Sequence, residues 1–323
     1  MRIYVRSFIL VALCFAVLLK LTGCGSDSCG PQSCQCETSL ESIWPNDDGR
    51  GWEYEYTWRT WSDTCEMYGN VDDVPPAPSL DKIEELLASH PVGSDVTTRV
   101  GTYKMRFDGD STTMSGATAQ ALRDTAYFPE ATLAAPGDMI STRAFLAARV
   151  MQGASGSGAL RSDEPGILGD IVLTPRPILI HGGAWEKTDE YIGTYGDIDT
   201  GLAWKFLEDD LCTGSEFSFE LSAPGGGGRY AHCRVLGNTG VETEMGHFEN
   251  GLDCIYMVDL GIMTYSGEHG AFGYRRHITY GNVIYVPDVG PVYSYERFLV
   301  CVGSTLSSGA GDMELSLIAT GKD

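Results

Sequence analysis

Hydrophobic and polar residues alternate with a period of two along much of the chain, a pattern typical of β-strands. The clearest case is residues 51–61, where one side of the expected strand is aromatic and the other is polar. The aromatic residues of this stripe are Trp52, Tyr54, Tyr56 and Trp58. We interpret the stripe as the core face of the first strand rather than as an exposed surface for stacking on sugars. A further strand is expected over 97–107, followed by a turn at Asp108-Gly109.

From about residue 167 onward, short apolar runs are separated by turn residues roughly every 8 to 12 positions, as in all-β domains. The expected strands are 169–174, 177–181, 188–195, 202–207, 215–222, 229–236, 241–246, 252–260, 273–280, 282–286, 291–301 and 312–319. This spacing favours antiparallel pairing over βαβ units. The predicted fold class is therefore mainly β with a few helices (α+β), built on a curved antiparallel sheet or half-barrel.

Three segments favour helix. Residues 81–89 carry a capping-box-like pair, Asp81 and Glu84, and an apolar face. Residues 117–127 and 138–151 also have helical composition. The Gly- and Ser-rich run 153–158 is the best internal boundary. It separates an N-terminal part, 43–155, from a β-rich C-terminal part, 156–323, unless the two form one continuous domain.

The N-terminus carries a secretion signal. Arg2 and Arg6 precede an apolar run of about a dozen residues, which is shorter than the roughly 20 residues of a membrane-spanning helix. The run ends in Leu21-Thr-Gly-Cys24, which resembles the lipobox of bacterial lipoproteins. By that resemblance, residues 1–23 are a signal peptide, Cys24 carries the lipid, and 24–42 form a lipidated tether. Gly25 follows the cysteine, so the expected destination is the outer membrane.

The chain is strongly acidic. Its formal net charge is −22, and removal of the three cations in residues 1–23 gives −22 − 3 = −25. Nucleic acid is therefore excluded as a partner, because its phosphates require Lys and Arg. A surface of this charge can instead attract cations.

Cysteine usage fits an oxidising compartment. Of the ten cysteines, Cys14 leaves with the signal peptide and Cys24 takes lipid. The other eight are candidates for structural disulfides: Cys29, Cys34, Cys36, Cys65, Cys212, Cys233, Cys254 and Cys301. The first three could also ligate a metal, but no nearby histidine completes a zinc pattern, so disulfides are favoured. The pairing stays open.

Two motifs suggest specific chemistry. Residues 176–185 contain His181-Gly182-Gly183, which looks like the oxyanion turn of α/β-hydrolase esterases. No Gly-x-Ser-x-Gly elbow follows it, so we interpret the glycines as a hairpin turn. Asp197-Ile-Asp199-Thr-Gly has the alternating oxygen ligands of a calcium loop, which makes Asp197 and Asp199 weak candidates for calcium. The alternative is a plain acidic turn.

The histidines do not have metal-site spacing. His247, His269 and His277 are separated by 22 and 8 residues, and we expect them on the surface or in turns. Paired carboxylates are too frequent in so acidic a chain to indicate glycosidase chemistry. The sequence therefore predicts no catalytic residues.

Two segments of the last third carry a resemblance. Residues 241–254, with Gly246-His-Phe248 and Asp253-Cys254, resemble the "GTF-x-DC" segment of many uncharacterised bacterial lipoproteins. Residues 282–292, around Pro287-Asp288, are similar to their "Y-APGVG-V" segment. The opening at Gly51 is similar to their "G-x-W-x-Y" start. Asp288 and His247 depart from the pattern. The resemblance implies a fold similar in outline to the half-barrels of periplasmic lipoprotein carriers.

These observations lead to one leading hypothesis and two alternatives. The leading hypothesis is an outer-membrane-anchored lipoprotein that acts as a binding or interaction module of the cell envelope, for a lipid, a peptide or a protein. One alternative is an envelope hydrolase of unidentified mechanism. The other is a structural, acidic surface lipoprotein that binds calcium.

Overall fold

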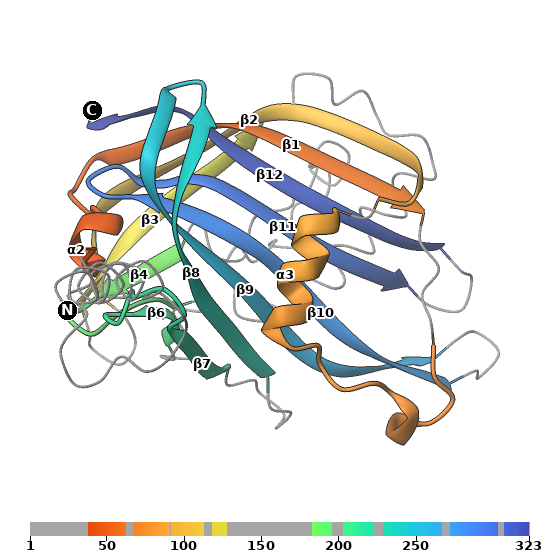
Figure 1. Ribbon diagram of the computed structural model, residues 1–323. Helices are drawn as coiled ribbons and strands as arrows, with labels where there is room; N and C mark the ends of the chain where they lie inside the picture. The colour runs from red at the N-terminus through yellow and green to blue at the C-terminus, as the bar shows by residue number, and fades with distance from the viewer. Residues whose placement is uncertain are drawn as a thin grey trace, which may run out of the picture. The chain divides into compact units, whose positions relative to one another are not determined.

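The computed structural model describes residues 38–62, 67–90, 92–112, 118–127, 183–195, 203–221, 229–266, 272–302 and 307–322. These residues belong to one compact unit, Cys36–Asp323. The described residues are almost entirely β-structure, with two short helices, α2 (Leu40–Ile43) and α3 (Leu80–Ser89), and a 3₁₀ turn, η1 (Val71–Asp73) (Figure 1). The prediction of a mainly β chain with a few helices is confirmed.

A single antiparallel sheet of twelve strands joins the N- and C-terminal parts of the chain. The strands are β1 (Arg50–Ser62), β2 (Ser94–Thr112), β3 (Thr118–Tyr127), β4 (Gly183–Lys187), β5 (Tyr191–Tyr195), β6 (Ala203–Glu208), β7 (Glu216–Leu221), β8 (Arg229–Thr243), β9 (Gly246–Ser266), β10 (Phe272–Val286), β11 (Gly290–Val302) and β12 (Ser307–Lys322). Their order in the sheet is β6-β5-β4-β3-β2-β1-β12-β11-β10-β9-β8-β7. The first strand therefore pairs with the last.

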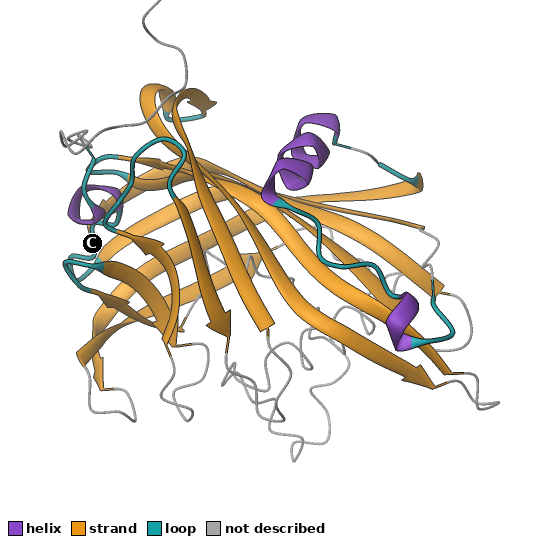
Figure 2. Cartoon of the chain, turned by 60° about the horizontal axis from the view of Figure 1, so that its bottom comes forward, coloured by secondary structure: helices purple, strands orange, loops and turns teal. Residues whose placement is uncertain are grey.

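The sheet curls until its two edge strands lie beside each other. β6 and β7 are neighbours in space but, among the described residues, they are not joined by a ladder of hydrogen bonds. Figure 2 shows the strands wrapping around a common interior. The result is a nearly closed barrel, which corrects the expected half-barrel. Twelve twisted strands are enough for an open sheet to curl back on itself.

The interior is filled by side chains from the inner faces of the strands. The predicted aromatic stripe is confirmed as core: Trp52, Tyr54, Tyr56 and Trp58 of β1 are all buried. Each pairs across the sheet with residues of β2 and β12, such as Tyr54 with Tyr103 and Tyr56 with Leu315. Alternation of apolar and polar residues along β1 thus places one face in the core, as expected for a strand of period two.

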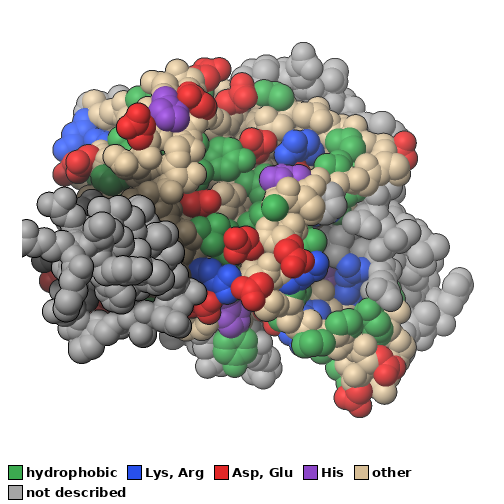
Figure 3. Space-filling view, viewed as in Figure 1, with side chains coloured by type: hydrophobic (Ala, Val, Ile, Leu, Met, Phe, Trp, Pro, Cys, Tyr) green, Lys and Arg blue, Asp and Glu red, His purple; other side chains and the backbone are tan. Residues whose placement is uncertain are grey.

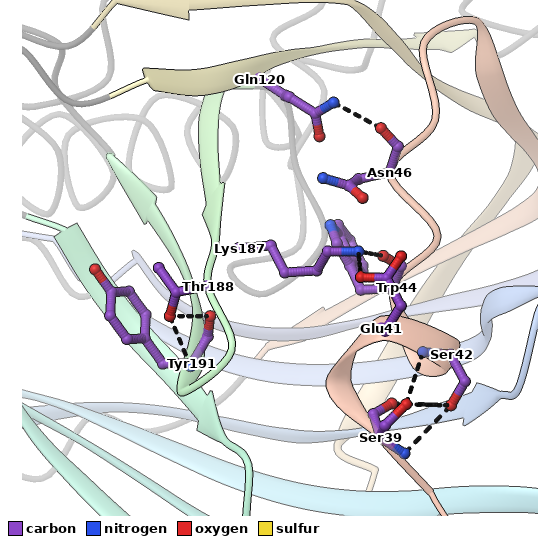
Figure 4. A network of polar contacts seen from close by, with 9 residues as sticks. All are labelled: Ser39, Glu41, Ser42, Trp44, Asn46, Gln120, Lys187, Thr188 and Tyr191. Carbon is purple, nitrogen blue, oxygen red and sulfur yellow. Dashed lines mark hydrogen bonds and ion pairs between the residues drawn. The ribbon is translucent and has the colours of Figure 1, made fainter.

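One end of the curled sheet is closed by α2 and the residue after it. The Trp44 ring stacks on Trp185 at 4.7 Å and on Trp52 at 5.9 Å between ring centroids. Lys187 of β4 reaches this segment, donating to the Trp44 carbonyl at 3.1 Å and pairing with Glu41 at 2.6 Å (Figure 4). Leu40 and Ile43 are buried, so the chain enters the fold before Trp44, within the segment expected to be tether. We refer to this end as the α2 end and to the opposite end as the far end.

The outer face of the sheet is covered in part by α3. Leu80, Ile83 and Leu87 of the helix pack on Ile255, Met257 and Tyr295 of β9 and β11. Figure 2 shows α3 lying outside the curled sheet. In the face shown in Figure 3, acidic side chains lie over α3 with basic side chains beside them. Arg234 of β8 pairs with Asp81 of α3 at 2.7 Å. The helix predicted over 81–89 is confirmed.

One predicted helix is wrong. Residues 118–127 form strand β3, paired with β2 on one side and β4 on the other. Their Ala, Leu and Arg content favours helix, but packing of Leu122 against Phe107 within the sheet overrides that preference. The other helix, 138–151, lies outside the described residues, as do the strands expected at 169–174 and 177–181. The hairpin predicted around Pro287-Asp288 is confirmed by the pairing of β10 with β11.

Candidate binding site

Towards the far end, polar residues appear among the apolar residues of the inner face. At the α2 end it carries tryptophan, tyrosine and phenylalanine side chains. Further along β10 and β11, four buried polar residues point to the interior: His277, Thr279, Ser294 and Glu296. They alternate in sequence with residues of the outer face, which fixes their direction. We call these four residues, with Tyr256, the polar layer.

The centre of the polar layer is a hydrogen bond between Tyr256 and Glu296. The Tyr256 hydroxyl donates to Glu296 Oε2 at 2.8 Å. The two residues belong to β9 and β11, and Gly281 of β10 lies between them, opposite both. A Cβ at position 281 would lie 2.8 Å from the Tyr256 hydroxyl, so the missing side chain leaves room for the tyrosine to cross. The Tyr256 hydroxyl is thereby one of the groups that hold the Glu296 side chain inside the barrel.

A cation lies on the same row of the sheet. Glu296 is opposite Met313, Met313 is opposite Trp58, and Trp58 is opposite Arg99. The Arg99 guanidinium carbon lies 5.2 Å from the centroid of the Trp58 ring, which is a cation–π contact. Three strand spacings separate Glu296 from Arg99, about 14 Å along the sheet. One row of the sheet therefore carries an acidic side chain, Glu296, and a basic side chain, Arg99, with the Trp58 ring between them.

His277 lies in the interior, not on the surface or in a turn as predicted. It is 3% exposed. Burial, together with the positive charge of Arg275, lowers the pKa of His277 to about 4. We expected His277 on the surface because the spacing of the histidines resembles no metal site. In the structure His277 alternates in phase with Thr279 and Gly281, on the side of β10 that faces the interior. At neutral pH the imidazole is uncharged and can accept or donate a hydrogen bond.

His277 and Glu296 do not form an acid–base pair. Gly281 is opposite Glu296, and His277 lies four residues earlier on β10, about 13 Å along the strand. The other buried carboxylates, Asp259 and Asp312, face outward, where they pair with Arg276 and Arg59. In the part of the chain that the structure describes, these carboxylates thus lie on opposite faces of the sheet. His277 and Glu296 are thus too far apart to cooperate in proton transfer.

A serine and a histidine meet on the outer face. Ser218 of β7 is opposite His232 of β8, and Ser218 Oγ lies 2.8 Å from His232 Nδ1. The ring of Tyr230 stacks beside His232. The pair has the contact of a nucleophile and its base, but it is exposed, and no described carboxylate is hydrogen-bonded to the imidazole to orient it. The contact is a cross-strand pair of a hairpin, which the sequence analysis did not single out.

Most residues that the sequence analysis singled out lie outside the described residues. This applies to Cys24, to the calcium candidates Asp197 and Asp199, and to four of the disulfide candidates, Cys29, Cys34, Cys36 and Cys65. Cys301 lies on β11, and its side chain is not among those described. Of the described His, Cys, Asp and Glu residues, no three or more gather in a group that could hold a metal ion. His247 is the turn histidine that was predicted, beside Glu242 at the β8–β9 hairpin.

The described cysteines divide into two kinds. Cys212 is disulfide-bonded. Cys233 and Cys254 are free and buried, which corrects the expectation that they form disulfides. The two lie on neighbouring strands but are not directly opposite, since Cys233 faces Tyr256 and Cys254 faces Val235. Diagonal neighbours on a sheet are about 7 Å apart, beyond the usual span of a disulfide.

The sequence did contain a signal for Glu296. The strand expected over 291–301 places Val292, Ser294, Glu296 and Phe298 on one face. An acidic residue in phase with apolar residues is unusual on a core-facing strand. Tyr256 and Gly281 could not be linked to it without the order of the strands.

None of the described helices is long and apolar enough to cross a membrane. No protein-family model matches the sequence, and no curated protein is significantly similar to it. Among solved structures, a protein of Bacteroides fragilis described as exported, with a YmcC-like fold, is 10% identical, with a TM-score of 0.30; the match covers 87% of this chain and 99% of that one. A protein of Parabacteroides distasonis described as a lipoprotein is 8% identical, with a TM-score of 0.31, over 87% and 98% of the two chains. Likenesses at these TM-scores say nothing further about this chain.

Proposed function

We propose that this chain is a lipoprotein of the cell envelope, anchored in the outer membrane through lipid on Cys24, and that its curled sheet is a binding module for a zwitterionic ligand of the peptide class. The signal-like segment 1–23 and the lipobox-like residues before Cys24 support the anchor. Labelling cells with a radioactive fatty acid tests it. Label in the intact chain and its loss in Cys24→Ser are expected, and an unlabelled intact chain would refute lipidation.

The observation that carries the binding proposal is the buried carboxylate of Glu296. An ionisable group in the interior costs stability, because it gives up hydration that a folded protein only partly replaces. Apolar side chains fill the neighbouring positions of the inner face, such as Met313 and Phe298. A glutamate retained among them points to use in binding rather than in folding.

The chemistry of the row favours a peptide over an acyl chain. At the α2 end the interior is occupied by stacked aromatic rings, so a lipid tail has no room there without displacing them. Along the row, Glu296 suits a positive group or a hydrogen-bond donor, and Arg99 suits a carboxylate. About 14 Å separates them along the sheet, which an extended peptide of about four residues spans.

A copurification experiment tests this proposal. The purified chain is incubated separately with a peptide extract and with a lipid extract of the envelope, and retained material is identified by mass spectrometry. We expect peptides to be retained by the native chain and largely lost in Glu296→Gln. Enrichment of lipid instead, or retention of nothing above background, would overturn the proposal.

The outer face offers a matched control. Glu314 of β12 accepts a hydrogen bond from Tyr293 at 3.2 Å and also pairs with Arg59 at 3.4 Å, so it shares a tyrosine donor with Glu296 but lies on the opposite face. Glu314→Gln should retain peptides as the native chain does. Equal losses in both variants would mean that the carboxylates act through general charge or stability, and not through a site in the interior.

The hydrolase alternative rests on the Ser218–His232 contact. An ester substrate such as p-nitrophenyl acetate tests it directly. Because the pair is exposed and lacks an orienting carboxylate among the described residues, we expect no hydrolysis that depends on Ser218. A rate that falls at least tenfold in Ser218→Ala, with the fold intact, would instead favour the hydrolase.

A further inference from the structure

Two free thiols share the interior near the α2 side of the polar layer. Cys233 of β8 and Cys254 of β9 both face inward and are buried, at 2% and 3% exposure. They are diagonal neighbours, because Cys233 faces Tyr256 and Cys254 faces Val235 two residues away. Apolar residues surround them, including Val235 and Val283, which is opposite Cys254 on β10.

The spacing suits a shared ion better than a sulfur–sulfur bond. A disulfide requires Cβ atoms about 3.5 to 4.5 Å apart, whereas diagonal neighbours on a sheet are about 7 Å apart, somewhat less at Cβ. Two thiolates that bind one metal ion at about 2.3 Å each lie up to roughly 4.6 Å apart. A shared ion therefore tolerates a wider separation of the two sulfurs than a disulfide does.

A third polar group lies beside the thiols. Tyr285 of β10 is buried, and its hydroxyl has no hydrogen-bond partner within the described part of the chain. Tyr285 is opposite Leu252, two residues from Cys254 on β9, so Tyr285 and Cys254 are diagonal neighbours on the inner face. Burial is the main cause that raises the pKa of Tyr285, and Cys254 and Cys233 raise it further. A buried hydroxyl without a partner costs about 1 to 3 kcal/mol, so a bound group that accepts its hydrogen bond would restore that loss.

We propose that Cys233 and Cys254 form a buried two-coordinate site for a soft monovalent metal ion, Cu⁺ in particular. On binding, both S–H groups lose their protons to solvent and two metal–sulfur bonds form, which leaves a complex of charge −1. The Tyr285 hydroxyl then donates to a thiolate sulfur. Soft thiolates select Cu⁺, while structural Zn²⁺ takes four ligands, which this site does not supply.

The edge of the sheet offers a path by which the ion can reach the two thiols. Cys233 is opposite Phe217 of β7, and β7 is the edge strand that no described ladder joins to β6. A single strand therefore separates the thiol from the seam of the barrel. Local opening of edge strands is less costly than opening of the core, so β7 can admit an ion without global unfolding.

Titration of the full purified chain with Cu⁺, under anaerobic conditions and in competition with bicinchoninate, tests the proposal. We expect the native chain to bind one equivalent of Cu⁺ at this site, with thiolate absorbance in the near ultraviolet. Cys233→Ala and Cys254→Ala should each lose this equivalent and its absorbance. Tyr285→Phe should keep the site with about tenfold to hundredfold weaker affinity. Val235→Ala is the matched control, since it shortens an equally buried neighbour on the same face and should keep the site.

Three results would overturn the proposal. The first is equal Cu⁺ binding by the native chain and by both cysteine variants, with all three folded by circular dichroism. The second is a disulfide between Cys233 and Cys254 in peptides from the non-reduced protein, because the oxidised pair has no thiolates to offer. Loss of Cu⁺ in Val235→Ala as well would assign the effect to packing and refute a specific site.

Discussion

Gly281 shows how a single position shapes the interior. A Cβ there would collide with the Tyr295 carbonyl oxygen and approach the Tyr256 hydroxyl to 2.8 Å. We expect Gly281→Ala to lower the free energy of unfolding by about 2 to 3 kcal/mol, because the backbone of β11 cannot move aside cheaply. Urea unfolding followed by tryptophan fluorescence measures the change.

A second glycine in the same sheet provides the control. Nothing lies within 4 Å of a Cβ built on Gly321 of β12, and its φ is not positive. Gly321→Ala should therefore change the free energy of unfolding by no more than about 0.5 kcal/mol. Similar losses at both positions would contradict the close packing described at Gly281.

His277 makes stability depend on pH. Its pKa is lowered to about 4 in the folded protein by burial and by Arg275, against about 6.5 in the unfolded chain. As pH falls through 6.5 the unfolded state takes up the proton first, so stability is lost from pH 6.5 down to pH 4. By pH 4.5 the loss should be about 2 to 3 kcal/mol.

The variant His277→Gln isolates this contribution, since glutamine can keep hydrogen bonds but does not titrate in this range. Unfolding by urea at pH 7 and at pH 4.5 should show a smaller difference for the variant than for the native chain. If the two differences are equal, the acid sensitivity arises elsewhere, for example in the carboxylates that pair with arginine.

At the scale of residues, the sequence was informative where a pattern repeats and uninformative where a single residue acts. The stripe from Trp52 to Trp58 was correctly assigned to the core, because four aromatics in phase leave little ambiguity. The prediction for His277 was wrong, because no neighbouring residue in the sequence indicates that this side of the strand faces the interior. The free state of Cys233 and Cys254 depends on the register between β8 and β9, which no local pattern reveals.

Among the elements, α3 depends on tertiary contacts. It has ten residues, too few to be stable alone, and its buried Ile83 packs on the outer face of β9 and β11. We expect Ile83→Ala to cost about 2 to 4 kcal/mol and to expose the helix to proteases before the sheet is cut. Limited proteolysis followed by mass spectrometry would detect this order of cleavage.

Lys82, the neighbour of Ile83, serves for comparison. It points to solvent and pairs with Glu85 at 2.6 Å, and both side chains are more than half exposed. Such a pair contributes little, so Lys82→Ala should shift stability by less than about 1 kcal/mol. Cleavage of both variants at the same rate would indicate that the helix is not held by its apolar face.

Elements were predictable where local and tertiary preferences agree. Helix α3 was predicted from its apolar face, which meets the sheet, and from Asp81 and Glu84 as a capping pair. The cap residue is instead Ser79, whose hydroxyl accepts from the Lys82 N–H, and Asp81 lies in the first turn. Strand β3 was mistaken for a helix because its composition favours one, and only pairing with β2 and β4 on both sides makes it a strand. The short β4 was missed since its glycine and charged residues resemble a loop.

For the whole molecule, the order of strands predicts a gradient of protection. β1 has partners on both sides, whereas β6 and β7 are each paired on one side among the described residues. Hydrogen exchange should be slowest in β1 and in β12, its partner, and at least about tenfold faster in β6 and β7. Uniform protection along the sheet would mean that the seam is closed by pairing.

The closure itself was beyond sequence analysis. Alternation indicates strands, and their spacing indicates antiparallel neighbours, but the pairing of β1 with β12 joins residues about 250 to 270 positions apart. Local sequence patterns give no information about contacts between residues so far apart in the chain. The polar layer has the same origin, because Tyr256, Gly281 and Glu296 meet only once β9, β10 and β11 are in register.

The pairing of the first described strand, β1, with the last, β12, also determines when the sheet can close. β1 is the first strand to be synthesised, and one of its two partners is the last, so a ribosome or a secretion channel must release almost the whole polypeptide before the sheet can close. Non-local contacts of this kind slow folding. Until β12 is available, the tryptophans and tyrosines of β1 lack the neighbouring strand on one side. The newly made chain therefore depends most on chaperones before its C-terminal strand has been released.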